Sequence, residues 1–148
     1  MFDKKITLFH QHAETKEQAL EMLANRFIAA GVVKDTYLEG ILKRESVFPT
    51  GLFTDTYGVA IPHADSDYVY ENQLGVMTLD EPVDFNYMGN AGEIVPVRII
   101  IMMAVQGHDQ VDMLMKLMSI FAEPEVLQEI IDCNDYETFA EIAKRIGL

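Results

Sequence analysis

Two histidines in this chain follow short apolar segments with the character of buried strands. His63 closes the sequence Gly58-Val-Ala-Ile-Pro-His63, in which a proline stops the strand and restricts the backbone just before the histidine. His108 comes soon after the apolar run 99–105 and just before a helix predicted to start near Asp109. In open α/β sheets, ligands gather beyond the carboxyl ends of the strands. If these two strands are parallel neighbours, both histidines lie on one rim of the sheet.

These residue types suit the transfer of a phosphoryl group. A neutral imidazole nitrogen is nucleophilic near physiological pH and forms a labile covalent intermediate, which makes His63 a candidate acceptor. The transferred group needs alignment and charge compensation more than proton chemistry. His108 is predicted where free backbone N–H groups collect at a helix start, a natural place for an anion. Arg44, at the predicted end of a helix, can hold a phosphoryl group with two parallel hydrogen bonds.

Each of these residues also has an ordinary structural interpretation. A single histidine after a strand is more often a surface or structural residue than a catalytic one, and Arg44 at a helix end interacts favourably with the helix dipole. His63, Asp65, His108 and Asp109 could instead form a metal site, because imidazole and carboxylate groups together suit divalent ions. A metal hydrolase would need three or four convergent ligands, however, and the sequence has no HExxH motif or close histidine cluster.

The elements that must position these residues follow from local patterns. Thr15-Lys-Glu-Gln18 is a capping box that opens a helix ending at Gly31. A second helix is expected from about residue 35 to Arg44, followed by a loop over 45–57. The pattern predicts strands over 5–9, 58–61, 74–79, 83–85 and 95–105, with a turn at 80–82 and a loop at 88–93.

Three helical patterns complete the chain, over a segment from about residue 109, over 124–132 and over 136–146. In the first of them five apolar residues share a face that we expect to pack in the core: Val111, Leu114, Met115, Met118 and Phe121. The methionines of this helix, Met113 included, are interpreted as core packing rather than a metal site. Mixed helices and strands, with fully apolar central strands, predict a single-domain α/β sandwich over residues 1–148.

Composition and charge exclude several classes of function. The net charge is -13, from 11 Lys+Arg against 24 Asp+Glu. This balance repels nucleic acids and anionic membrane surfaces and favours a basic protein partner. The single cysteine, Cys133, excludes an internal disulfide framework. Because the N-terminus lacks a signal-peptide pattern and the longest apolar run is too short to span a bilayer, we expect a cytoplasmic, soluble protein.

The order of these motifs resembles a known family. Arg44-Glu-Ser-Val-Phe-Pro-Thr-Gly51 followed by Gly58-Val-Ala-Ile-Pro-His63 resembles the enzyme IIA domains of the fructose–mannitol class. These domains belong to the bacterial phosphoenolpyruvate-dependent sugar phosphotransferase system. The likeness covers most of the chain, from the N-terminal helix pair to the late strand before Gly107-His108. The loop between Pro49 and His63 is longer than in typical fructose or mannitol members and looks more like the galactitol-type branch.

The resemblance implies a function and a set of partners. His63 matches the phosphorylated histidine, His108 the second active-site histidine, and Arg44 the arginine that orients and neutralises the phosphoryl group. The protein would be a phosphotransferase component that accepts phosphate from the phosphocarrier HPr and passes it to a cysteine of an enzyme IIB component during sugar uptake. The implied fold is a mixed central sheet with helices on both sides. No metal or organic cofactor is implied.

Two other functions remain consistent with the sequence. A regulatory homologue of the nitrogen-related branch would also be phosphorylated on His63, but its phosphorylation state would control binding to a regulator or channel. Alternatively, the family fold could be retained with a silent site, although the presence of His63, His108 and Arg44 together weakens this alternative. The sequence does not fix the sugar, the oligomeric state, or the nitrogen of His63 that is attacked.

Overall fold

The fold is organised around two long antiparallel strands that form a hairpin. The computed structural model describes all 148 residues. β4 (Gln73–Tyr87) and β5 (Asn90–Ala104) are joined by a tight turn at residues 88–89. Residues 73–79 of β4 and 99–104 of β5 are buried without interruption. Such continuous burial requires that both faces of the sheet are covered, which is why these segments lack a hydrophobic–polar alternation.

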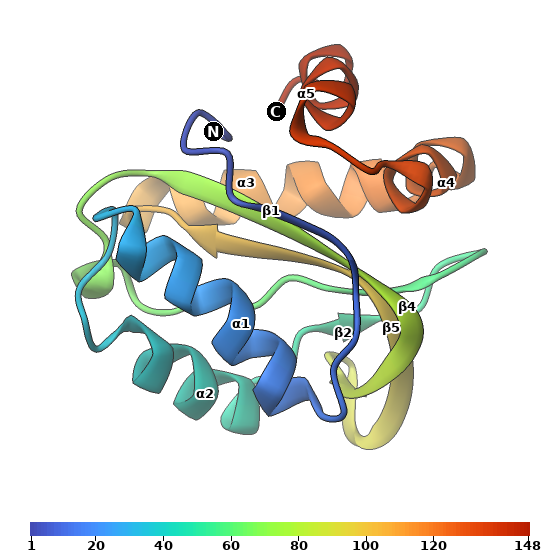
Figure 1. Ribbon diagram of the computed structural model, residues 1–148. Helices are drawn as coiled ribbons and strands as arrows, with labels where there is room; N and C mark the ends of the chain where they lie inside the picture. The colour runs from blue at the N-terminus through green and yellow to red at the C-terminus, as the bar shows by residue number, and fades with distance from the viewer.

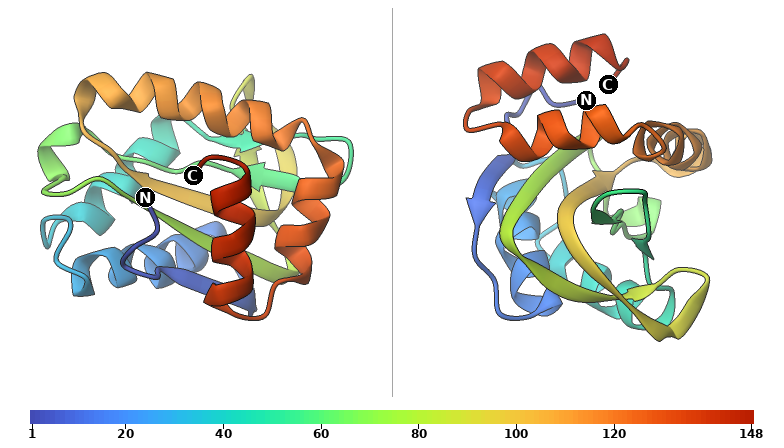
Figure 2. Two further views of the ribbon diagram at one scale, coloured as in Figure 1. Left: turned by 90° about the horizontal axis from the view of Figure 1, so that it is seen from above. Right: turned by 90° about the vertical axis from the view of Figure 1, so that its right-hand side faces the viewer.

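Three shorter strands extend this hairpin into a mixed sheet. The strand order is β1-β4-β2-β3-β5, and β4 also pairs directly with β5. β1 (Thr7–Gln11) runs parallel to β4, and β3 (Gly58–Ala60) runs parallel to β5. β2 (Gly51–Leu52) is antiparallel to β3 and parallel to the far end of β4. The right-hand view of Figure 2 shows the strong curvature of β4 and β5 that brings this end of the hairpin to β2.

Helices cover both faces of the sheet (Figure 1). α1 (Lys16–Ala29) and α2 (Tyr37–Val47) lie on one face. α3 (Gly107–Phe121), α4 (Pro124–Asp132) and α5 (Tyr136–Arg145) cover the other. No helix is both long and apolar enough to cross a membrane. The predicted sandwich with a mixed central sheet and helices on both sides is therefore confirmed.

Two hydrophobic clusters of similar size fill the space between the sheet and the helices. Successive residues of β5 alternate between them: Ile100 packs in the cluster with α1 and α2, whereas Ile99 and Ile101 pack in the cluster with α3, α4 and α5. This alternation follows from the two-residue repeat of a strand. The clusters contain 23 and 20 buried residues, so neither face of the sheet is left uncovered.

The first helix begins and ends as its sequence predicts. The Thr15 side chain accepts a hydrogen bond from the Gln18 backbone N–H at 3.1 Å, and the Gln18 side chain accepts one from the Glu14 N–H at 2.7 Å. Gly31 follows the helix with φ of 74°, a conformation that glycine adopts without strain. By contrast, β1 begins at Thr7 rather than Lys5, whose φ of 56° lies outside the extended region, and it continues to Gln11 through a register shift at His10, where φ is 53°.

The second helix is longer than predicted. It continues to Val47, so Arg44 and Glu45 lie within its last turns rather than at its end. Glu45 is buried, and its carboxylate accepts hydrogen bonds from the backbone N–H and the hydroxyl of Thr50, at 2.7 and 2.8 Å. These bonds tie the end of α2 to the start of β2, and they place a short strand inside the segment 45–57 that was predicted to be loop.

The segments 74–79 and 83–85 form one strand and not two. A register shift between Thr78 and Val83 absorbs the residues Asp80, Glu81 and Pro82, which were predicted to form a turn. A bulge of this kind accommodates a proline, because the ladder is interrupted there and no N–H donor is needed. The predicted loop 88–93 is likewise mostly strand, since β5 begins at Asn90.

α3 presents only part of the predicted face to the core, because Phe121 is buried and Leu114 packs against the cluster, whereas the other three residues of that face do not. It begins at Gly107, and Leu117, Ile120 and Phe121 are its buried residues. Val111, Met115 and Met118, predicted to be in the core, are 63%, 66% and 45% exposed. The helix carries apolar residues on two sides, so the helical repeat alone does not decide which side packs on the sheet. An apolar stripe is consequently exposed along α3.

We expect the close contact between β3 and β5 to depend on Gly58. A Cβ atom at this position would overlap the carbonyl oxygen of Pro96 in β5, whereas a Cβ at Gly92 would meet only the side chain of Asn90, at 3.5 Å. Gly58→Ala should therefore lower the free energy of unfolding by about 2 kcal/mol or more in urea denaturation. Gly92→Ala, in the same sheet, should change it by less than about 0.5 kcal/mol. Equal effects of the two substitutions would contradict this interpretation.

Candidate active site

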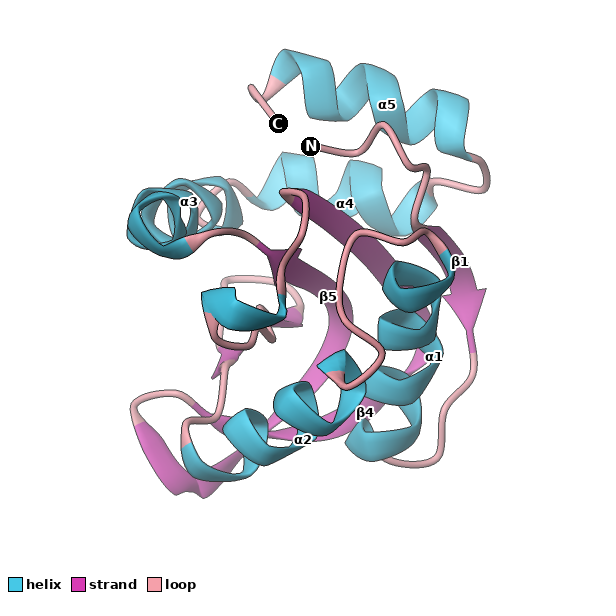
Figure 3. Ribbon diagram, turned by 90° about the vertical axis from the view of Figure 1, so that its left-hand side faces the viewer, coloured by secondary structure: helices cyan, strands magenta, loops and turns pink.

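His63 lies on the rim of the sheet at the carboxyl end of β3. Because β3 and β5 are parallel neighbours, the segments that follow them emerge on the same side, as the sequence suggests. The backbone of His63 still pairs with Met103 of β5, and the Met103 N–H donates to the Pro62 carbonyl at 2.9 Å. Figure 3 looks at this edge of the sheet, with α3 above it and α2 below. The backbone at the rim is therefore hydrogen-bonded to the central hairpin.

The His63 ring is held by its own backbone. Nδ1 lies 2.9 Å from the carbonyl oxygen of Ile61. A carbonyl oxygen only accepts hydrogen bonds, so Nδ1 carries the proton and Nε2 carries the free lone pair. The residue is only 6% exposed, which limits rotation of the ring. The local backbone therefore leaves Nε2 as the ring nitrogen with a free lone pair.

The surroundings of His63 favour the neutral ring. Burial lowers the pKa of His63 below its usual value of 6.5, and the positive charge of Arg44 lowers it further. The bond to the Ile61 carbonyl and the negative charge of Asp65 act in the opposite direction, but the pKa remains lowered. A neutral ring at pH 7 keeps the Nε2 lone pair available for covalent bond formation.

Arg44 approaches the same rim from α2. Its Nη1 lies 3.6 Å from Oδ1 of Asp65, and its guanidinium stacks over the ring of Phe48 with 5.3 Å to the ring centroid. Nε is buried and has no hydrogen-bond partner. A buried unpaired N–H group costs about 1–3 kcal/mol, and an anionic ligand at this place would satisfy it. Arg44 thus has donors available for a bidentate contact.

α2 is anchored to the strand that carries the site. The buried hydroxyl of Tyr37, at the start of α2, donates to the Met103 carbonyl at 2.7 Å. Met103 is the same residue that pairs with His63. At the other end of α2, the bonds from Thr50 to Glu45 hold the last turn. Arg44 is therefore carried by a helix that is fixed at both ends.

His108 lies in the first turn of α3 and its side chain is 89% exposed. Its Nε2 lies 3.4 Å from Oδ1 of Asp109, and no contact joins its ring to His63 or Arg44. The helix start itself is close to His63, because Gln110 Nε2 donates to the Ala64 carbonyl at 3.0 Å. The structure thus brings His63 and Arg44 together, and it brings the backbone around His108, but not the ring, to the same rim.

Sequence reasoning gave no role in a phosphoryl site to four residues that shape this rim. Glu45 and Tyr37 position α2, Gln110 joins α3 to the residue after His63, and Asp65 pairs with Arg44. Only Glu45 could have been identified from the sequence, because it directly follows Arg44 in the motif and precedes Thr50 by five residues. Asp65 was considered only as a metal ligand, and no group of three or more His, Cys, Asp or Glu side chains is arranged to hold a metal ion.

Comparison with known proteins identifies relatives over nearly the whole chain. The model of the family described as "Phosphoenolpyruvate-dependent sugar phosphotransferase system, EIIA 2" matches residues 1–146. The galactitol-specific EIIA component of Escherichia coli (strain K12) is 22% identical over 116 residues, which cover 78% of this chain and 77% of that protein. The ascorbate-specific EIIA component of Mycoplasma pneumoniae is 28% identical over 142 residues, covering 94% and 86%.

A solved structure shares the fold. The mannitol enzyme IIA of Escherichia coli, determined in complex with phosphorylated enzyme IIB, superposes with a TM-score of 0.79 at 19% identity. The superposition covers 95% of each chain. The arrangement of layers described above is therefore that of a known enzyme IIA.

The two kinds of histidine in this chain should titrate on opposite sides of the usual value. An NMR titration should place the pKa of His63 below 6.5, because burial disfavours its charged form. His12 is the internal control, since its hydrogen bond to Glu14 raises its pKa above 6.5. The ¹⁵N shifts should also show the His63 proton on Nδ1 at neutral pH. A His63 ring that is charged at pH 7, or protonated on Nε2, would contradict the assignment.

Proposed function

The chain belongs to the EIIA 2 family of the phosphoenolpyruvate-dependent sugar phosphotransferase system, and we propose that it is a phosphoryl carrier. His63 takes the group from phospho-HPr and passes it to a cysteine of an enzyme IIB component. The observation that carries this proposal is the state of the His63 ring, which is neutral, buried and fixed with Nε2 free. The protein works in the cytoplasm, where these partners would meet it.

The transfer can be written with this chain's own atoms. The Nε2 lone pair attacks phosphorus, the bond from phosphorus to the donor breaks, and that electron pair leaves with the donor. Nδ1 keeps its proton, held by the Ile61 carbonyl, so no base is required. In the second step the Nε2–phosphorus bond breaks, its electron pair returns to the ring, and the acceptor thiolate bonds to phosphorus. Phosphoryl transfer of this type relies on alignment and charge compensation.

Arg44 and His108 supply that charge compensation. The guanidinium of Arg44 has a buried, unpaired Nε and lies close enough to His63 to influence its pKa. His108 stands on the first turn of α3, where backbone N–H groups and the positive end of the helix dipole favour an anion. Its exposed ring is free to turn toward the phosphoryl group when a partner covers the rim.

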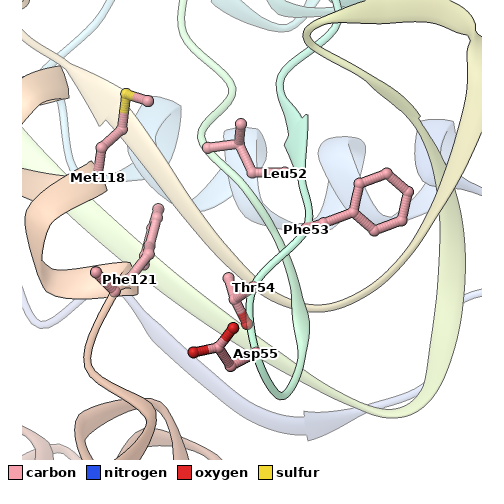
Figure 4. Close-up of a pocket in the computed structure, with 7 residues that line it drawn as sticks. Leu52, Phe53, Thr54, Asp55, Met118 and Phe121 are labelled. Carbon is pink, nitrogen blue, oxygen red and sulfur yellow. The ribbon is translucent and has the colours of Figure 1, made fainter.

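Exposed apolar residues on α2 and α3, the two helices that reach the rim of His63, support docking of a protein rather than a small molecule. Val47 and Phe48 end α2, and Val111, Met115 and Met118 form the exposed stripe on α3. A groove lies between α3 and the loop that follows β2, lined by Met118 and Phe121 on one side and Leu52 to Asp55 on the other. In Figure 4, Leu52 points toward α3, whereas the ring of Phe53 points away from it.

The chemistry of this surface fits a partner that presents an apolar anchor with basic neighbours. Exposed methionines adapt to more than one shape, which suits a carrier with two partners. Asp55 lines the groove, and the whole chain carries a net charge of -13. Complementary charge accelerates encounter and fixes orientation. The partner that delivers the phosphoryl group is therefore expected to be basic.

The sugar is chosen by the membrane component and not by this chain. We propose galactitol, because of the long loop between Pro49 and His63 and because galactitol-specific EIIA components are among the relatives. Another relative is ascorbate-specific, so the test of the sugar is transfer to purified enzyme IIB components of both specificities.

Phosphorylation should occur at one residue. Incubation with labelled phosphoenolpyruvate, enzyme I and HPr should add one acid-labile, base-stable phosphoryl group, which mass mapping should locate on His63. His63→Ala should abolish the label. His12→Ala is the matched control and should keep it, because His12 is exposed and pairs only with Glu14.

The label should then be lost to an enzyme IIB. Label retained on His63→Ala would disprove the assignment of the acceptor. A labelled wild-type chain that transfers to no enzyme IIB would instead favour the regulatory branch.

The groove should govern partner affinity and not the chemistry at His63. Met118→Lys should raise the KM for phospho-HPr about tenfold with little change in kcat, the size of effect expected for an interface anchor. Ile94→Lys is the control, because Ile94 is 48% exposed, close to the 45% of Met118, but lies on the β4–β5 hairpin and does not line the groove. Equal KM values for the two variants would show that partners dock elsewhere.

A further inference from the structure

Asp65 faces the arginine that the phosphoryl group needs. It follows His63 by two residues and is exposed at the N-terminal cap of a short 3-10 helix (Ser66–Tyr68). Its Oδ1 lies 3.6 Å from Nη1 of Arg44, beyond ordinary hydrogen-bond distance. The two residues form a long ion pair, in which Arg44 leaves its buried Nε without any partner.

This pair leaves the donors of Arg44 available for an anion. A carboxylate that satisfied the guanidinium fully would accept two parallel hydrogen bonds, one to each oxygen. Here only one long contact is made, and stacking on Phe48 completes the support of the guanidinium. Asp65 and Arg44 line one cavity with Lys43 and Tyr68. A dianionic phosphoryl group on Nε2 of His63 would thus offer Arg44 better hydrogen bonds than Asp65 does.

We propose that Asp65 is a positioning residue that holds Arg44 in the unphosphorylated carrier and competes with the phosphoryl group for it in the phosphorylated one. This inference rests on the proposed function. When phosphorus bonds to Nε2, Arg44 turns from Asp65 to the phosphoryl oxygens, and Asp65 is left as an unpaired carboxylate beside a dianion. Their repulsion raises the free energy of the phosphorylated state. When the group departs, Asp65 takes Arg44 back.

A counter-ion such as Asp65 helps a carrier that must release its phosphoryl group to an acceptor. An arginine with no competitor would stabilise phospho-His63 and delay transfer to the acceptor. Asp65 reduces that stabilisation without removing the donor that aligns the group. The other acidic residues near the rim make no ion pair with Arg44. The Glu45 carboxylate accepts hydrogen bonds from Thr50, Asp109 pairs with His108, and Asp67 makes no ion pair. Asp65 alone has the contact that this competition requires.

The test is the equilibrium of phosphoryl exchange with HPr. The chain is mixed with known amounts of HPr and phospho-HPr, and the phosphorylated fraction of each protein is measured after quenching. Asp65→Asn should shift the equilibrium constant about fivefold toward phospho-His63, the effect expected of one charge close to another near a protein surface. Asp67→Asn is the matched control, with the same change in net charge, and should shift it less than about twofold.

Two further variants separate competition from a structural role. Asp65→Glu keeps the charge and should behave as the wild type. In an Arg44→Gln background, Asp65→Asn should have a smaller effect than in the wild type, because there is no arginine to release. The difference between Asp65→Asn and Asp67→Asn should also shrink at high salt, which screens exposed charges.

The possible failures are distinguishable. If the wild type accepts the phosphoryl group but Asp65→Asn and Asp67→Asn give the same equilibrium constant, the role of Asp65 is refuted and the relay stands. An equilibrium shifted toward HPr by Asp65→Asn would also refute it, because Asp65 would then assist the phosphorylated state. If the wild type takes no phosphoryl group from phospho-HPr, both the relay and this inference fail.

Discussion

The parallel pairing of β3 with β5 is the constraint on which the rest of the site depends. It brings two segments that are far apart in the chain to one edge of the sheet, and the pairing continues beyond β3 to His63 and Met103. The Met103 carbonyl also accepts a hydrogen bond from the Tyr37 hydroxyl, so the helix that carries Arg44 is attached to the same residue. One strand end thereby fixes both His63 and the helix that carries Arg44. Alignment of this kind is the main requirement of phosphoryl transfer.

The sequence predicts the layers of this fold better than it predicts where each element ends and which side of a helix is buried. The apolar run 99–105 and the strand before His63 were located because a strand buried on both faces needs no alternation. The bulge at Asp80 to Pro82 was taken for a turn, because the same residue types serve both purposes. Val111, Met115 and Met118 of α3 were placed in the core together with Phe121, but the helix packs through Phe121 and the neighbouring side with Leu117 and Ile120, which is equally apolar. Choosing between two apolar sides requires tertiary information.

Within the site, the residue types could be predicted, but not which ring nitrogen carries the proton or which side chains lie in contact. His63 and Arg44 were identified from motif and position, and the structure brings them to one rim. The hydrogen bond from Nδ1 to the Ile61 carbonyl depends on backbone geometry after Pro62, which no pattern encodes. The same holds for Asp65, whose significance comes entirely from its distance to Arg44. Residue identity thus indicates the chemistry, whereas close contacts decide which atom performs it.

The bond between Nδ1 and the Ile61 carbonyl also has a kinetic consequence. Because one edge of the ring is committed to the backbone and the residue is almost fully buried, only Nε2 can face a partner. In the proposed relay, a donor and an acceptor must then approach through the same opening, and neither can be bound while the other occupies it. A carrier built on this ring follows ping-pong order. In such a relay one partner must leave before the next arrives, which favours brief, weak encounters over tight complexes.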